Sequence, residues 1–229
     1  MTRLVRVLVG GTALALAVSV AMVAWTGRPV GTPTRGTSTL DAVGDFGSVP
    51  DFSLVERTGR RVTLADLRGK VWLANFIYTQ CTETCPLQSA EVARLQREFG
   101  EARDLRFVSI TVDPEHDKPA VLREYASRYQ ADPERWLFLT GSKAAIYALA
   151  KDGFKLGVTD AGTTQAESAG WLVGPTPAFA SHGSKGLIMH SARFVLVDRK
   201  ARIRAYHRSD DPDSLTGLRQ NLRALLAES

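Results

Sequence analysis

The residues with the clearest chemical potential are two cysteines close together in the chain. Cys81 and Cys85 are the only cysteines, three residues separate them, and Pro86 follows. Two thiolates suit a soft ion such as Cu(I), which accepts low coordination and can add an imidazole. They can also form an exchangeable disulfide. They do not complete a structural zinc site, which takes four protein ligands. The pair therefore predicts either a copper site or a redox site.

Four histidines are candidates for a further ligand. His190 is favoured because it lies at the head of a predicted strand, where a fixed backbone can aim its ring. His182 lies eight residues earlier, in an irregular stretch, and remains the competing ligand. His116 follows the second buried strand, which brings it to the cysteine end of the sheet if the strands are parallel. His207 ends an edge hairpin, and we expect it at the surface.

The cysteines lie where a predicted strand turns into a helix. Residues 71–78 form a nearly continuous apolar run, which is typical of a strand buried on both faces. A helical pattern begins at Pro86. The N-terminus of a helix stabilises a thiolate and lowers its pKa. Because Cys85 is next to Pro86, this effect is expected at Cys85.

The remaining elements predict an α/β domain. A strand followed by the cysteine motif and a helix is typical of thioredoxin-like folds, and the further order indicates a mixed central sheet flanked by helices. Residues 158–186 form an irregular excursion of the length that is often functional. The further strands are predicted at 105–112, 136–140, 188–197 and 201–207, with helices beginning at Asp117 and Ser142 and a closing helix through 215–226.

The N-terminus predicts a membrane anchor. Residues 7–27 carry no charge, and as a helix they would match a hydrocarbon core of about 30 Å. A cleaved signal peptide is the alternative, but its apolar region is normally shorter. A short basic N-terminus normally stays cytoplasmic. We therefore expect a single-pass anchor in the inner membrane at 1–27, a linker at 28–44, and a domain at 45–229 on the periplasmic or extracytoplasmic side.

The net charge of +5 does not indicate a nucleic-acid partner. Four of the 29 basic residues lie within the first 35 positions, where there is no acidic residue. The other 25 are balanced by 24 acidic residues. A nucleic-acid-binding domain would carry a clustered basic excess, so none is expected here.

Three segments carry a resemblance to a known family: FIYTQCTETCP at 76–86, VDPEHDKP at 112–119 and MHSARFVLVDRKARI at 189–203. In this order they resemble the Sco/SenC family, whose members are membrane-anchored, thioredoxin-like proteins involved in assembling cytochrome c oxidase. The resemblance covers roughly residues 45–229. The family often has proline after the first cysteine, where this chain has Thr82.

The resemblance implies a copper metallochaperone rather than an enzyme. Cys81, Cys85 and His190 match the family's copper ligands, and Asp113 and Asp117 match the acidic segment beside the site. The cargo is Cu(I), Cu(II) or both. The implied acceptor is the copper-bearing subunit of cytochrome c oxidase, and a thioredoxin-like reductant or another copper chaperone is a further possible partner.

A thiol-disulfide oxidoreductase is the alternative function. It would use Cys81 as the exposed attacking thiol and would not need the histidine. The two roles are compatible, because a disulfide between Cys81 and Cys85 must be reduced before copper binds. Peroxide reduction is less favoured, since Glu83 lies between the cysteines. An inert disulfide is also less favoured, because closing so short a loop adds little stability.

Overall fold

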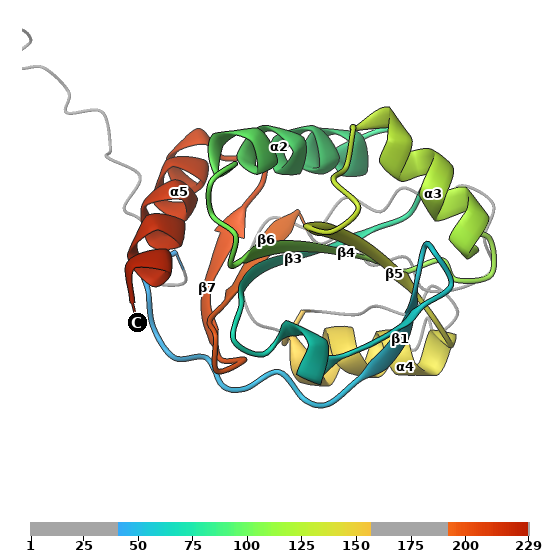
Figure 1. Cartoon of the computed structure of the whole chain (residues 1–229), viewed down its shortest axis with the longest axis horizontal. Coiled ribbons are helices and arrows are strands. Elements are labelled where there is room, and N and C mark those ends of the chain that lie inside the picture. Colours follow the sequence, from blue (N-terminus) through green and yellow to red (C-terminus); the bar gives the residue numbers. More distant parts are fainter. Residues whose placement is uncertain (1–40, 157–191, 229) are drawn as a thin grey trace, which may run out of the picture. The chain divides into compact units, whose positions relative to one another are not determined.

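The structure is a computed structural model and describes residues 41–156 and 192–228. In this part of the chain, seven strands form one sheet in the order β2-β1-β5-β4-β3-β6-β7 (Figure 1). The strands are β1 (Ser53–Glu56), β2 (Arg61–Thr63), β3 (Val71–Ile77), β4 (Leu105–Thr111), β5 (Trp136–Thr140), β6 (Arg193–Val197) and β7 (Ile203–Arg208). The helices are η1 (Leu64–Leu67), α2 (Thr84–Glu98), α3 (Pro119–Arg128), α4 (Lys143–Ala148), η2 (Leu149–Gly153) and α5 (Pro212–Ala227).

The sheet is parallel in its centre and antiparallel on both sides. Strands β3, β4 and β5 run parallel, whereas β6 pairs with β3 and β1 pairs with β5 in the antiparallel sense. Ile77, the last residue of β3, lies opposite Thr111, the last residue of β4. The loops that follow these two strands therefore leave the same edge of the sheet.

Helices cover both faces of the sheet. Figure 1 shows α2 and α3 on one side and α4 on the other. Side chains of β3 alternate between the two resulting cores, with Trp72 in the core beside α4 and Leu73 in the core beneath α2. Both are at most 1% exposed. Burial on both faces explains why this strand is a nearly continuous apolar run in the sequence.

The elements of the structure agree with most of those expected from the sequence. The three parallel strands and the closing helix are confirmed. The first long helix begins at Thr84 rather than Pro86, which places Cys85 inside its first turn. The second strand of the hairpin begins at Ile203, because Ala201 takes a left-handed turn conformation with φ 61°. Helix α4 passes into one π-helical turn, η2, which periodicity alone did not indicate.

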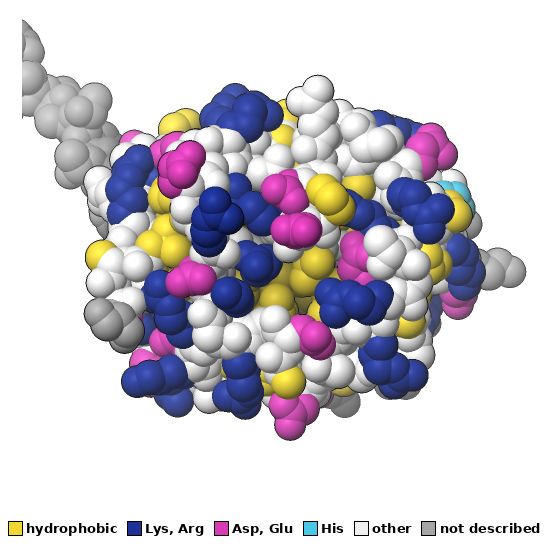
Figure 2. Space-filling view, in the orientation of Figure 1, with side chains coloured by type: hydrophobic (Ala, Val, Ile, Leu, Met, Phe, Trp, Pro, Cys, Tyr) yellow, Lys and Arg dark blue, Asp and Glu magenta, His cyan; other side chains and the backbone are white. Residues whose placement is uncertain are grey.

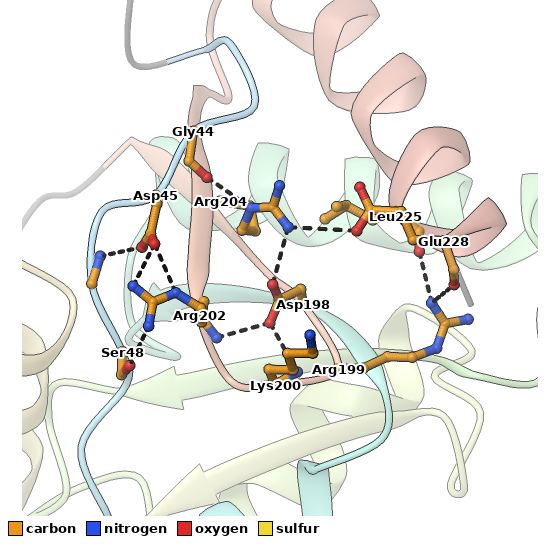
Figure 3. A network of polar contacts seen from close by, with 11 residues as sticks. Gly44, Asp45, Ser48, Asp198, Arg199, Lys200, Arg202, Arg204, Leu225 and Glu228 are labelled. Atoms are coloured by element: carbon orange, nitrogen blue, oxygen red, sulfur yellow. Dashed lines mark hydrogen bonds and ion pairs between the residues drawn. The ribbon is translucent and has the colours of Figure 1, made fainter.

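An arm formed by residues 41–49 covers the outer strand β7. The backbone N–H of Gly44 donates to the carbonyl of Arg204 over 2.8 Å, and that of Phe46 donates to Ile203 over 2.9 Å. Figure 3 shows that arginines also connect the arm to the hairpin, since Arg202 pairs with Asp45 and Arg204 donates to the Gly44 carbonyl over 2.7 Å. The arm thus protects an edge that would otherwise expose unpaired backbone groups.

The expectation that His207 lies at the surface is wrong. Its side chain is 0% exposed, and its Nε2 lies 3.1 Å from Nδ2 of Asn221 on α5. Its Nδ1 lies 3.9 Å from Oδ1 of Asp41 in the arm. Burial lowers the pKa of His207. The hairpin seemed to end at an open edge because nothing in the sequence predicts that the arm and α5 cover it.

Several expectations concern residues outside the described ranges. The apolar stretch at 7–27, the excursion at 158–186 and both His182 and His190 belong to this group. Within residues 41–156 and 192–228, no helix combines the length and hydropathy that a membrane crossing requires. On the face shown in Figure 2, basic and acidic side chains are interspersed.

Candidate metal centre

The two cysteines face each other across the junction between β3 and α2. Cys81 lies in the loop after β3, and its N–H donates to the carbonyl of Tyr78 over 3.1 Å. Cys85 lies in the first turn of α2, and its N–H donates to Sγ of Cys81 over 3.4 Å. Both cysteines are free and buried, with 6% and 5% of their surface exposed. The start of the helix therefore directs a backbone donor at the sulfur of Cys81.

The two thiols ionise very differently. A hydrogen bond from the Cys85 thiol is the main cause that lowers the pKa of Cys81 to about 5, assisted by the N–H groups of Cys85 and Glu83 and the Tyr78 hydroxyl. Burial opposes this shift. The same hydrogen bond raises the pKa of Cys85, and burial raises it further. Cys81 is therefore a thiolate at neutral pH, and Cys85 is the thiol that stabilises it.

This result corrects two expectations from the sequence. The helix start lowers the pKa of a thiol as predicted, but it acts on Cys81 rather than on Cys85. Cys81 is also largely buried rather than an openly exposed thiol. It is reached through a cleft of about 660 Å³, lined by Tyr78, Thr79, Gln80, Cys81, Thr82, Glu83 and Arg128. Tyr78 packs against both cores with part of its side chain and also lines this cleft beside Cys81.

A buried carboxylate fixes the loop that leads to Cys81. Asp117 is 0% exposed and lies in the loop after β4. It accepts hydrogen bonds from the N–H of Thr79 at 3.0 Å, the hydroxyl of Thr79 at 2.5 Å and the hydroxyl of Thr111 at 2.5 Å. Because several donors converge on one carboxylate, the residues preceding Cys81 are held firmly against β4.

Asp113 acts through its backbone. Its carbonyl accepts the N–H of Asp117 over 2.8 Å and that of His116 over 3.2 Å. This turn presents the Asp117 carboxylate to the loop before Cys81. Of the two acidic residues predicted beside the site, Asp117 is thus the one whose side chain contacts that loop.

His116 lies beside the loop that leads to Cys81, but it does not form a metal-binding group with the two sulfurs in the described part of the chain. Its side chain is 43% exposed, with Nδ1 3.0 Å from Asp117 Oδ1 and Nε2 3.2 Å from Nε2 of Gln80. Among the residues that the structure describes, no three His, Cys, Asp or Glu side chains are arranged to hold a metal ion. The described part of the site therefore offers two sulfurs and no third ligand.

Two adjoining sulfurs, one of them ionised, fit a soft ion of low coordination such as Cu(I). They fit thiol-disulfide exchange equally well, since a thiolate attacks and its neighbour can close a disulfide. Sequence reasoning missed Tyr78 and Thr79, which shape the cleft. Their position between an apolar strand and the first cysteine was the available signal.

A mixed sheet with a cysteine pair between a central strand and a helix defines a thioredoxin-like protein. The chain belongs to the SCO1/SenC family, whose sequence profile matches residues 45–222. It is 39% identical to the SCO1 protein homolog of Bacillus subtilis over 132 residues, which cover 56% of this chain and 68% of that protein.

Two solved structures share this fold. BsSco, described with a disulfide switch and as a member of the Sco family of cytochrome c oxidase assembly proteins, is 26% identical with a TM-score of 0.63, over 82% of this chain and 98% of its own. Arabidopsis thaliana ScoI, solved with copper bound, is 25% identical with a TM-score of 0.58, over 78% of this chain and 99% of its own.

Proposed function

We propose that this chain is a copper metallochaperone that binds one copper ion through Cys81, Cys85 and His190. It delivers the ion to the copper-bearing subunit of a respiratory cytochrome c oxidase. The observation that carries this proposal is the pair of adjoining cysteines at an open cleft: Cys81 lines the cleft, and its Sγ accepts the N–H of Cys85 over 3.4 Å. The copper-bound Arabidopsis relative and the oxidase-assembly family of BsSco support copper and the oxidase, respectively.

The unequal thiols suit a protein that must load and release a metal. Cys81 offers an ionised sulfur without prior loss of a proton, whereas Cys85 releases its proton as the metal binds. The cleft leaves the Cys81 side of the site open to an acceptor ligand. The ion then passes by ligand exchange, in which a sulfur of the acceptor replaces one ligand of the chaperone at a time.

His190 is the proposed third ligand because of its place in the chain. It precedes strand β6 by three residues, and β6 pairs directly with β3, the strand that leads to Cys81. His182 remains the competing ligand.

A copper titration of the reduced full-length chain under anaerobic conditions tests the proposal. We expect one Cu(I) per chain, with affinity measured by competition with a chromophoric chelator. Serine at Cys81 or Cys85 should abolish tight binding, and His190→Ala should weaken it. His182→Ala is the matched control and should bind as the wild type does. Tight binding by His190→Ala together with loss of binding by His182→Ala would overturn the ligand assignment.

Thiol-disulfide oxidoreductase activity is the second candidate function. A reactive thiolate at Cys81 beside a buried thiol at Cys85 is the arrangement that an attacking and a resolving cysteine need. The substrate would be a disulfide of the oxidase subunit or of another exported protein. A His190→Ala variant that fails to bind copper yet fully restores oxidase assembly in cells would favour this function over metal delivery.

The same proposal includes the location of the chain in the cell and the proteins with which it works. Residues 7–27 would anchor the chain once in the inner membrane, with the domain on the periplasmic or extracytoplasmic side. In that oxidising compartment, the Cys81 and Cys85 thiols need a thioredoxin-like reductant before copper can bind. Another copper chaperone would supply the ion. Protease accessibility of the domain in intact spheroplasts tests this orientation.

A further inference from the structure

Two buried polar atoms face each other where the arm begins, and neither has a hydrogen-bond partner in the described part of the chain. They are Nδ1 of His207 on β7 and Oδ1 of Asp41 in the arm. They lie 3.9 Å apart, which is beyond hydrogen-bond distance. The two residues are 0% and 7% exposed. A buried polar atom without a partner costs free energy, so core packing alone does not account for this pair.

The amide of Asn221 on α5 determines which ring nitrogen of His207 carries the proton. Asn221 Nδ2 donates to the carbonyl of Asp41 over 2.7 Å, which fixes the amide with its NH2 group toward the arm. The same Nδ2 lies 3.1 Å from His207 Nε2. Because an amide nitrogen only donates, Nε2 must accept, and the neutral ring therefore carries its proton on Nδ1. One amide group thus holds both the ring and the start of the arm.

Protonation of the neutral ring is incompatible with this arrangement. The added proton binds to Nε2, whose lone pair accepts the hydrogen bond from Asn221, so two donors would face each other. If the Asn221 amide turns over, its oxygen can accept from Nε2, but it then faces the carbonyl oxygen of Asp41. The charged form of His207 and the bond from α5 to the arm therefore exclude each other.

The charged group that faces His207 among the described residues is the Asp41 carboxylate, which favours protonation. The other neighbours are neutral, since Phe194 lies opposite on β6 and α5 contributes Asn221 and the backbone of Ser214. Burial is the largest influence on the pKa of His207 and lowers it, against the opposite effects of Asp41 and Ser214. The buried ring takes up a proton less readily than an exposed one, so protonation favours the state in which the start of the arm is open.

The rest of the arm is held by contacts that do not titrate near neutral pH. Asp45 pairs with Arg202 in the middle of the arm, and the N–H of Val49 donates to the carbonyl of Ala201 over 2.9 Å at its far end. Neither contact involves a group that changes its charge between about pH 5 and about pH 8. Acid should therefore loosen residues 41–44 and leave the far end of the arm in place.

We propose that His207, Asn221 and Asp41 form an acid-sensitive latch, which holds the first residues of the arm when His207 is neutral and releases them when it is protonated. The release uncovers this end of β7, an outer strand whose backbone groups the arm otherwise pairs. None of the three residues is a proposed copper ligand, so the latch can fail without affecting the proposed function.

Hydrogen exchange at the Gly44 amide tests the latch, because this N–H donates to the carbonyl of Arg204 near the start of the arm. The reduced, metal-free, full-length chain is compared at about pH 7.5 and about pH 5.5, and each rate is divided by the intrinsic exchange rate at that pH. An open state in which His207 titrates at about 6.5 gains about tenfold in population over this range if the closed state stays neutral. We therefore expect the protection of Gly44 to fall by up to about tenfold and that of Val49 to change by less than about twofold.

Two variants and a control assign the effect to the latch. His207→Gln can still accept the hydrogen bond from Asn221 but does not titrate, so Gly44 should keep its protection at the lower pH. Asn221→Asp places an acceptor beside Nε2, so protonation should raise the protection of Gly44 instead of lowering it. His116→Gln is the matched control, because it removes a histidine that is 43% exposed on another loop. It should show the same fall in protection as the wild type.

Three results would overturn the latch. They are unchanged protection of Gly44 in the wild type, the same fall in His207→Gln, and an equal fall at Val49, which would indicate that acid loosens the whole domain. If His207→Gln does not fold, the sign of the change in Asn221→Asp decides, and a fall as large as that of the wild type contradicts the latch. Copper binding by the chain, whatever its strength, tests the proposed function alone.

Discussion

Replacing Asp117 should destabilise the fold more than replacing any other acidic residue near the cysteines. Its carboxylate is 0% exposed and accepts three hydrogen bonds from Thr79 and Thr111. In Asp117→Ala these buried donors lose a charged acceptor. Each bond to a charged group contributes about 1.5–3 kcal/mol, but the contributions are not additive when one carboxylate is shared. We therefore expect a loss of about 3–4 kcal/mol in the free energy of unfolding.

The isosteric change separates the charge from the shape. Asp117→Asn keeps one acceptor oxygen, which at the Oδ2 position can still accept the Thr79 N–H and the Thr111 hydroxyl. The Thr79 hydroxyl, which donates to Oδ1, can rotate to accept from the new amide. This substitution should cost about 1–2 kcal/mol. The assay is urea unfolding of the reduced, metal-free chain, in which the midpoint shifts at constant slope if only stability changes.

Asp113 provides the control for this prediction. Its backbone makes the turn, whereas its side chain lies outside the bonds to Thr79. Asp113→Ala should change the stability by less than about 0.5 kcal/mol. Equal losses in Asp113→Ala and Asp117→Ala, or a loss below about 1 kcal/mol in Asp117→Ala, would refute the view that the Asp117 carboxylate holds the loop before Cys81.

Three further predictions concern ionisation. Because the pKa of Cys81 is lowered to about 5, its alkylation by iodoacetamide should stay fast from neutral pH down to about pH 5. Peptide mass spectrometry should find the label on Cys81. Preferential labelling of Cys85 would contradict the assignment of the thiolate to Cys81. Tyr78→Phe removes a donor to that thiolate, so the midpoint of the same profile should move to higher pH while the unfolding free energy changes little. Burial lowers the pKa of His207 below its unfolded value of about 6.5, so stability should fall as the pH drops below about 6.5. Urea midpoints at several pH values should show this slope in the wild type and lose it in His207→Gln.

The sequence predicted the central strands well because their burial is symmetrical. In β3, side chains on both faces enter a core, so almost every position of residues 71–77 is apolar. The cysteine motif could likewise be placed between a strand and a helix from the local pattern alone. These features depend on neighbours in the chain, which a sequence shows directly.

Features that join distant segments could not be predicted in the same way. The bond between Thr79 and Asp117 connects residues 38 positions apart, and the bond between Gln88 and Ser209 connects residues 121 positions apart. Which cysteine carries the thiolate depends on the direction of one hydrogen bond, and the motif is the same for either direction. His207 appeared exposed for a similar reason, since its covering arm lies far away in the sequence.

X-ray absorption of the full-length chain, reduced and loaded with one Cu(I), tests the central claim most directly. We predict a copper ion with two sulfur ligands and one imidazole nitrogen, and a spectrum of His190→Ala that retains the sulfurs and loses the nitrogen. A wild-type spectrum with fewer than two sulfurs, or an imidazole signal that persists in His190→Ala, would contradict a site made by Cys81, Cys85 and His190.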